Sequence, residues 1–184
     1  SSLGVKDKSL LLDLARRFRL KEAVPTIAKL ADSGDVPRSD ALKTFNEIGV
    51  GDPALFEAFL SDPDDAVRRE AVIGYSISAG IDGVAKMAGM WDGLPGLLRQ
   101  LALDGMLRTK ESAAAFVLAA AGGKFKGAGA SATERAISLL GMEHPAITKL
   151  LESSEGLLIP VISLKGDPGG HVPVAIDLDG PFTV

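Results

Sequence analysis

Apolar residues in this 184-residue chain recur with helical period, in segments separated by short breaks at glycine, proline and aspartate. The segments come in pairs, as is typical of two helices joined by a turn. The predicted pairs are residues 10–20 with 23–31, 39–48 with 54–60, 64–79 with 84–91, 94–107 with 112–121, and 133–140 with 145–151. The pattern therefore predicts about five helix pairs and an all-α fold.

A small residue in the first segment of each pair marks a repeating register. These residues are 26, 30, 31 and 34 positions apart by their numbering, and they are Ala15, Ala41, Ala71, Ala102 and Ala136. A helix pair of about 30 residues cannot bury its apolar stripe alone, whereas stacked pairs share one core. The spacing therefore predicts a helical repeat in which small residues let the helices approach closely.

The residues at the breaks agree with this interpretation. Asp-Pro steps occur at residues 52–53 and 62–63, where aspartate can cap a helix and a first-turn proline costs no hydrogen bond. Four glycines fall where helices are expected to stop, namely Gly34, Gly49, Gly80 and Gly141.

Residues 61–72, which read SDPDDAVRREAV, resemble the turn and first helix of a HEAT repeat. That family's pattern has an Asp-Pro turn followed by Asp, Val-Arg and Ala at fixed offsets. The resemblance implies a HEAT-like right-handed α-solenoid, with helix pairs over residues 8–153. It also implies that Asp62 lies in the turn, and that Asp65 and Arg68 lie near the junction of neighbouring repeats and join a hydrogen-bonded ladder. We further expect Asp65 to cap the helix start, a contribution of about 1 kcal/mol.

After Gly156 the pattern changes from helix to strand. Residues 157–164 are β-rich, residues 166–170 form a turn signal, and residues 172–178 alternate between apolar and other side chains. We therefore predict a helical domain at residues 1–156 and a short β appendage at residues 157–184.

The last residues, Gly-Pro-Phe-Thr-Val at 180–184, are similar to the opening strand of a laminin-G or concanavalin-like sandwich. With the helical repeats, they resemble multidomain exported bacterial proteins that also carry c-type cytochrome or dehydrogenase modules. This resemblance implies a periplasmic location and adjacent domains of the same chain as partners. Since the sequence opens without Met, we expect a fragment of a longer protein.

Composition excludes several classes of function. The chain has no cysteine, which removes thiolate catalysis, disulfides and iron–sulfur clusters. A net charge of -4 argues against a nucleic-acid partner, including a HEAT-like DNA-lesion enzyme, which would need a basic concave face. The richest apolar stretch, residues 113–121, is far shorter than the roughly 20 residues of a membrane span.

The remaining polar residues predict no catalytic, cofactor or metal site. His144 and His171 have no histidine partner at helical spacing, so surface or capping roles are expected. The cluster of Asp62, Asp64 and Asp65 fits helix capping better than cation binding. Another pair, Asp177 and Asp179, shares one solvated strand face.

The glycine-rich segment 122–131 leaves two alternatives open. Residues 127–132 satisfy G-x-G-x-x-A, but a dinucleotide site needs a preceding strand, and residues 113–121 are helical by composition. We therefore expect a flexible insertion that lengthens the fourth repeat. The alternative is an enzyme or ligand-binding domain whose weak anion site comprises Lys124, Lys126, Gly127 and Gly129.

Four large apolar residues form a further candidate, an exposed groove for a partner: Phe56, Phe59, Met87 and Trp91. The same helical spacing is also typical of a shared core. Taken together, the sequence predicts a non-catalytic scaffold or spacer whose curved repeat surface holds a partner protein or a neighbouring domain.

Overall fold

The computed structural model describes residues 4–153, which form ten α-helices and two short 3-10 helices and contain no strand. The α-helices are α1 (Val5–Phe18), α2 (Val24–Asp32), α3 (Arg38–Ile48), α4 (Ala54–Glu57), α5 (Asp65–Ser78), α6 (Gly80–Met90), α7 (Gly96–Met106), α8 (Lys110–Ala121), α9 (Ala130–Leu140) and α10 (Pro145–Glu152). The 3-10 helices are Lys21–Ala23 and Trp91–Gly93. The β appendage predicted at residues 157–184 lies outside the described residues.

Each of the ten predicted segments overlaps one helix, so the all-α prediction is confirmed for residues 4–153. The largest differences are at helix boundaries. The short helix α4 ends at Glu57 because the following amides donate to carbonyls three residues back, which tightens the chain into 3-10 turns. The next pair has almost no loop: Ala79 is both the C-cap of α5 and the N-cap of α6, and Gly80 turns the chain with φ of 54°.

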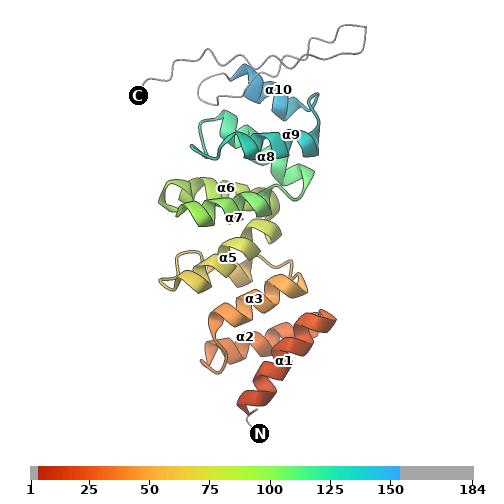
Figure 1. Ribbon diagram of the computed structural model, residues 1–184, viewed down its shortest axis with the longest axis vertical. Coiled ribbons are helices and arrows are strands. Elements are labelled where there is room, and N and C mark those ends of the chain that lie inside the picture. Colours follow the sequence, from red (N-terminus) through yellow and green to blue (C-terminus); the bar gives the residue numbers. More distant parts are fainter. Residues whose placement is uncertain (1–3, 154–184) are drawn as a thin grey trace.

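The helix pairs stack one after another along the long axis of the molecule (Figure 1). Successive first helices α1, α3, α5 and α7 each pack on the next, and α6, α8 and α10 do the same in a second row. One hydrophobic cluster of buried residues runs through all the pairs, from Leu12 in α1 to Leu150 in α10. Each pair therefore completes its core with side chains from its neighbours.

The five register alanines confirm the predicted spacing. They lie in α1, α3, α5, α7 and α9, and none is more than 2% exposed. The four predicted glycine stops also have the expected backbone, since all have positive φ. Gly49, for example, ends α3 with φ of 78°, and its amide donates to the carbonyl of Phe45.

Polar contacts link the first helices at the edges of this core. They join Arg16 Nε to Thr44 Oγ1 (2.9 Å), Asn46 Nδ2 to the Glu70 carbonyl oxygen (3.0 Å) and Arg135 Nη1 to Asp104 Oδ1 (2.6 Å). Each pair of partners comes from different helices, so these contacts depend on how far one helix is shifted along the next.

The first helices α5 and α7 approach each other closely at Gly105 in α7. A Cβ atom at this position would lie 2.6 Å from the Cβ of Ser76 in α5 and 3.0 Å from its carbonyl carbon. Gly74 in α5 has a similar role, because a Cβ there would collide with the ring of Phe56. At these two points only glycine lets the helices pack at the observed separation.

Substituting Gly105 by alanine is expected to destabilise the chain by about 1 to 3 kcal/mol, since the backbone of Ser76 cannot move aside cheaply. Gly89→Ala in α6 is the matched control, because nothing lies within 4 Å of a Cβ there. The control is expected to stabilise by about 0.5 to 1 kcal/mol through helix propensity alone. Urea unfolding followed by circular dichroism measures both changes, and equal effects would contradict the close approach.

Candidate functional site

The predicted turn residues Asp62, Asp65 and Arg68 come together at the start of α5. Arg68 donates from Nη1 to the carbonyl oxygen of Asp62 at 2.8 Å and from Nη2 to the carboxylate of Asp65. These hydrogen bonds stay within the turn that belongs to α5, and they do not extend to another helix pair. Asp65 and Arg68 therefore form their hydrogen bonds within this turn, and these bonds do not build the ladder between repeats that the resemblance implies.

The helix cap itself is Asp64, which corrects the expectation that Asp65 has this role. Asp64 has extended backbone angles, and its side chain accepts a hydrogen bond from the amide of Ala66 at 2.8 Å. Asp62 supports it by accepting from the amide of Asp64 at 2.9 Å. Asp65 is already the first helical residue, and its side chain points into solvent with 88% of its area exposed. An N-cap needs non-helical backbone angles, which only Asp64 has.

Asp64→Ala is expected to cost about 1 kcal/mol of unfolding free energy, because it leaves a first-turn amide without its acceptor. Asp65→Ala removes the same carboxylate from the neighbouring position and is expected to change stability by no more than about 0.5 kcal/mol. Chemical denaturation of the two variants and the parent chain compares them directly. A larger loss of unfolding free energy for Asp65→Ala than for Asp64→Ala would show that Asp65 is the cap.

A surface groove of about 450 Å³ lies between the start of α5 and the start of α7. One wall carries the charged residues Asp64, Asp65, Arg68 and Arg69, and the other carries Pro95, Leu97 and Leu98. Since the walls belong to consecutive helix pairs, the groove exists only where two pairs meet.

Two side chains in the groove remain available for contacts with a ligand. Leu97 is 64% exposed, the largest exposed fraction among the large apolar residues of the described chain. Arg69 has about half of its side chain exposed, and its Nε lies 3.9 Å from the nearest carboxylate oxygen, that of Glu70. The groove therefore offers an apolar contact beside a guanidinium group.

Sequence reasoning singled out Asp65 and Arg68 on the α5 wall as structural turn residues only, and it missed the groove itself, Arg69 and the whole α7 wall. Pro95, Leu97 and Leu98 belong to a run that reads as ordinary core-forming helix. The sequence carried no signal that separates the two leucines, because neighbouring residues about 100° apart on a helix can both face one core, as Ala71 and Val72 do. Here Leu98 is buried in the core and Leu97 faces out.

The predicted apolar groove of Phe56, Phe59, Met87 and Trp91 is wrong for three of its four members. Phe56 and Met87 are completely buried and Trp91 is 2% exposed, because their helical spacing directs them into the shared core. Phe59 is half-buried and lines a smaller cavity of about 180 Å³ between α2, α3 and α4. The guanidinium carbon of Arg38 lies 5.9 Å from its ring centre.

The segment 122–131 is anchored at its centre, which corrects the expectation of a flexible insertion. Phe125 is 4% exposed, and its ring centre lies 5.0 Å from those of Trp91 and Phe116. In addition, Trp91 Nε1 donates to the carbonyl oxygen of Lys126 at 2.8 Å. The loop is held because an aromatic residue between two lysines reaches into the core.

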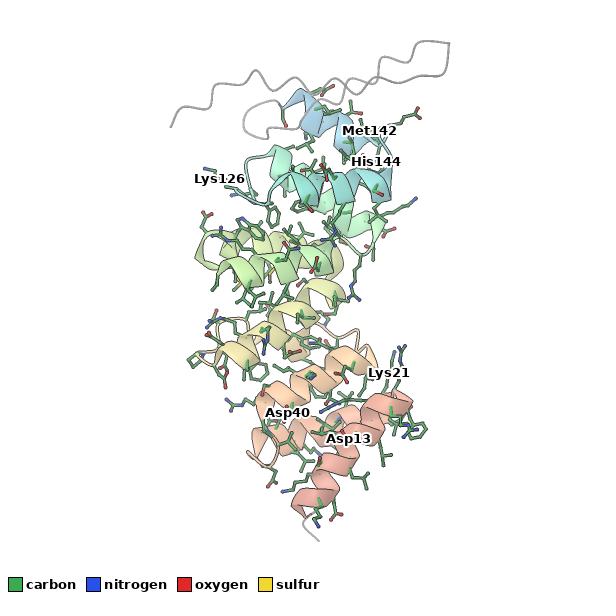
Figure 2. The ribbon with its side chains drawn as sticks, viewed as in Figure 1. Asp13, Lys21, Asp40, Lys126, Met142 and His144 are labelled. Atoms are coloured by element: carbon green, nitrogen blue, oxygen red, sulfur yellow. The ribbon has the colours of Figure 1, made fainter. Side chains whose placement is uncertain are left out.

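The residues of the alternative anion site face outward around this anchor. Lys124 and Lys126 are exposed, and Figure 2 shows Lys126 at the edge of the molecule beside the loop that leads into α9. Gly127 and Gly129 have φ of 75° and 82°, and Gly129 precedes α9 without a side-chain cap. The four predicted residues thus lie exposed in one loop.

Phe125→Ala is expected to lower the free energy of unfolding by about 3 kcal/mol, because it leaves a cavity beside two aromatic rings. Lys124→Ala, one position away and exposed, is the control and is expected to change it by less than about 0.5 kcal/mol. Trp91 is the only tryptophan of the chain. Its emission should shift to longer wavelength in folded Phe125→Ala, and an unchanged spectrum with unchanged stability would show that the loop is not anchored.

The shifted pKa values belong to groups in hydrogen-bonded pairs between different elements and to a buried tyrosine. The hydrogen bond from Lys8 lowers the pKa of Asp35, and the hydrogen bond to Glu57 raises the pKa of Lys86. Burial raises the pKa of the Tyr75 hydroxyl. These groups act as structural contacts, since none of them lines the groove between α5 and α7.

His144 has the capping role predicted for it. It precedes α10 (Figure 2), and its Nδ1 accepts from the amide of Ala146 at 3.2 Å. Within residues 4–153 no group of three or more His, Cys, Asp or Glu side chains is placed to hold a metal ion. The other candidates, His171, Asp177 and Asp179, lie outside the described residues.

Among the helices that the structure describes, none is both long and apolar enough to span a membrane. Comparison of the chain with protein-family models, curated proteins and solved structures finds no match.

Proposed function

We propose that this chain is a HEAT-like helical-repeat module, of right-handed α-solenoid form, that holds a partner protein or a neighbouring domain without a chemical step. The observation that carries the proposal is the groove between α5 and α7. Support also comes from the stacked pairs and their continuous core, because stacked repeats present extended surfaces between neighbouring units.

The groove favours a ligand with both apolar and acidic character. Its volume of about 450 Å³ lies within the range of specific ligand sites. Leu97 supplies apolar area that becomes favourable when water is removed from it, and Arg69 supplies donors for a carboxylate. Arg68 is already hydrogen-bonded in its own turn, so it shapes the wall and leaves recognition to Arg69. The proposed partner therefore presents a peptide segment with an acidic residue next to an apolar one.

The expected partners are a separate protein or another domain of the same chain. A multidomain exported bacterial protein and a periplasmic location remain predictions of the resemblance at residues 61–72 and 180–184.

Peptide selection tests the groove directly. A random peptide library displayed on phage is selected against the immobilised chain, and the selected peptides are measured by fluorescence anisotropy. We expect the peptides to share an acidic and an apolar residue, and to bind Leu97→Asp and Arg69→Glu about tenfold more weakly, the loss of about one good contact. Leu118→Asp in α8 is the control, since Leu118 is exposed at 43% and lies outside the groove.

Selected peptides that bind both groove variants as tightly as the parent would contradict the proposed site.

Titration with inorganic phosphate tests the alternative function at residues 122–131, with the amide resonances of residues 127–132 as the readout. Exposed helix-terminal amides and two lysines are expected to give millimolar affinity at best. Saturation at micromolar phosphate would overturn the non-catalytic proposal and favour the enzyme alternative.

A further inference from the structure

A small pocket of about 180 Å³ opens between α2 of the first helix pair and α3 and α4 of the second. Its floor includes the buried side chains of Leu42 and Phe45, which are 2% and 3% exposed. Phe59, which is half-buried, forms part of the wall. The lining residues are apolar except for Asp32 and Arg38, both of which are exposed. The pocket thus has an apolar interior and a charged mouth.

The pocket is hollow because small residues occupy positions where larger side chains would fill the space between the helices. Four of its lining residues are alanines, at positions 28, 31, 41 and 54. Apolar walls in contact with water are unfavourable. A ligand that displaces water from these walls therefore gains free energy in proportion to the apolar area it covers.

The volume of the pocket suits one apolar side chain. Sites for drug-sized ligands measure about 300 to 1,000 Å³, whereas a cavity of about 150 Å³ holds a single benzene ring. The interior of about 180 Å³ therefore has room for a side chain of the size of leucine or phenylalanine. Any polar part of such a ligand lies outside the interior, at the charged mouth.

The mouth carries one negative and one positive side chain. Asp32 is the last residue of α2, and Arg38 is the first residue of α3. Neither forms an ion pair within residues 4–153, although both line the same pocket. Among the described residues no other charged side chain lines it. The macrodipoles have the same sense as these charges, since the end of α2 favours a cation and the start of α3 favours an anion.

The guanidinium group of Arg38 lies over the apolar wall of the pocket. Its central carbon is 5.9 Å from the ring centre of Phe59, which is within the range of a cation–π contact. A guanidinium group has a planar fork of N–H donors that matches the two oxygens of a carboxylate. Arg38 is therefore placed to bind a carboxylate next to an apolar group held in the pocket.

We propose that this pocket binds a free apolar α-amino acid of the size of leucine or phenylalanine. The side chain of the ligand enters the interior, its carboxylate binds Arg38 and its ammonium group binds Asp32. An α-amino acid carries these three groups on one carbon atom, so it uses the apolar interior and both charges of the mouth. An apolar residue inside a partner protein has neither charge on its backbone and would leave Asp32 and Arg38 unused.

The bound amino acid bridges two helix pairs, because α2 belongs to the first pair and α3 and α4 to the second. A ligand that binds only the folded chain raises its stability. Both charged contacts lie in solvent, so the dissociation constant is expected to be on the order of hundreds of micromolar. The pocket shares no residue with the groove between α5 and α7, so the two proposals stand or fall separately.

An NMR titration of the chain with L-leucine, L-phenylalanine and blocked forms of leucine tests the ligand class. We expect saturable shifts with both amino acids, and no binding of glycine, which has the charges without the side chain. N-acetyl-L-leucine lacks the ammonium group and L-leucinamide lacks the carboxylate, so each is expected to bind about tenfold more weakly than L-leucine. N-acetyl-L-leucinamide lacks both charges, as an internal residue of a protein does, and is expected to bind more weakly still.

Variants of the chain assign each charge to its partner. Arg38→Gln is expected to weaken L-leucine about tenfold but to leave L-leucinamide nearly unchanged, because that ligand has no carboxylate to lose. Asp32→Asn should behave in the same way toward L-leucine and N-acetyl-L-leucine. Lys43→Gln is the control, since it removes an exposed cation of α3 that lies outside the pocket. Ala28→Leu fills the interior and is expected to abolish binding. Circular dichroism confirms that each variant is folded.

Three results would overturn the proposal. One is a parent chain that binds neither L-leucine nor L-phenylalanine up to about 10 mM. Another is N-acetyl-L-leucinamide binding as tightly as L-leucine, which would assign the pocket to an apolar side chain of a partner protein. The third is an equal affinity of Arg38→Gln and Lys43→Gln for L-leucine, which would show that the mouth does not bind the carboxylate.

Discussion

Each helix pair in this chain has more apolar surface than it can cover by itself, and the stacking of pairs is what removes that surface from water. Stacking at this distance depends on the smallest residues at the contacts between first helices. Ala71 and Ala102 are completely buried, and Gly105 faces the backbone of Ser76 with no room for a methyl group. The polar contacts between first helices and the burial of Trp91 depend on the same short distance between helix pairs, because both need neighbouring pairs to pack closely.

The groove between α5 and α7 is a consequence of that stacking. Its charged wall comes from the capped start of α5, and its apolar wall comes from the start of α7 in the next pair. The rotation of α7 that buries Leu98 in the core also turns Leu97 toward the groove. Packing and the candidate binding surface are therefore set by one helix orientation.

Local sequence determined the helices, their pairing and their ends. The ten helices, the buried register alanines and the positive φ of the four glycine stops depend on residues within a few positions of each other, so periodicity and break residues were enough to predict them. The same information did not separate Asp64 from Asp65 as the cap of α5. Both are good capping residues in sequence, and only the backbone angles of the folded turn distinguish them.

Tertiary structure alone decided what lies inside and what lies on the surface between pairs. The sequence of segment 122–131 predicts a flexible loop. In the fold, the ring of Phe125 packs against Trp91 and Phe116, which belong to other elements. In the sequence, Phe56 and Met87 have the spacing expected of surface residues that anchor a partner. In the fold, neighbouring helices cover both of them. Helical period fixes which residues share a face, but the partner of that face depends on how the pairs stack. That information resides in contacts between distant residues, which no local pattern encodes.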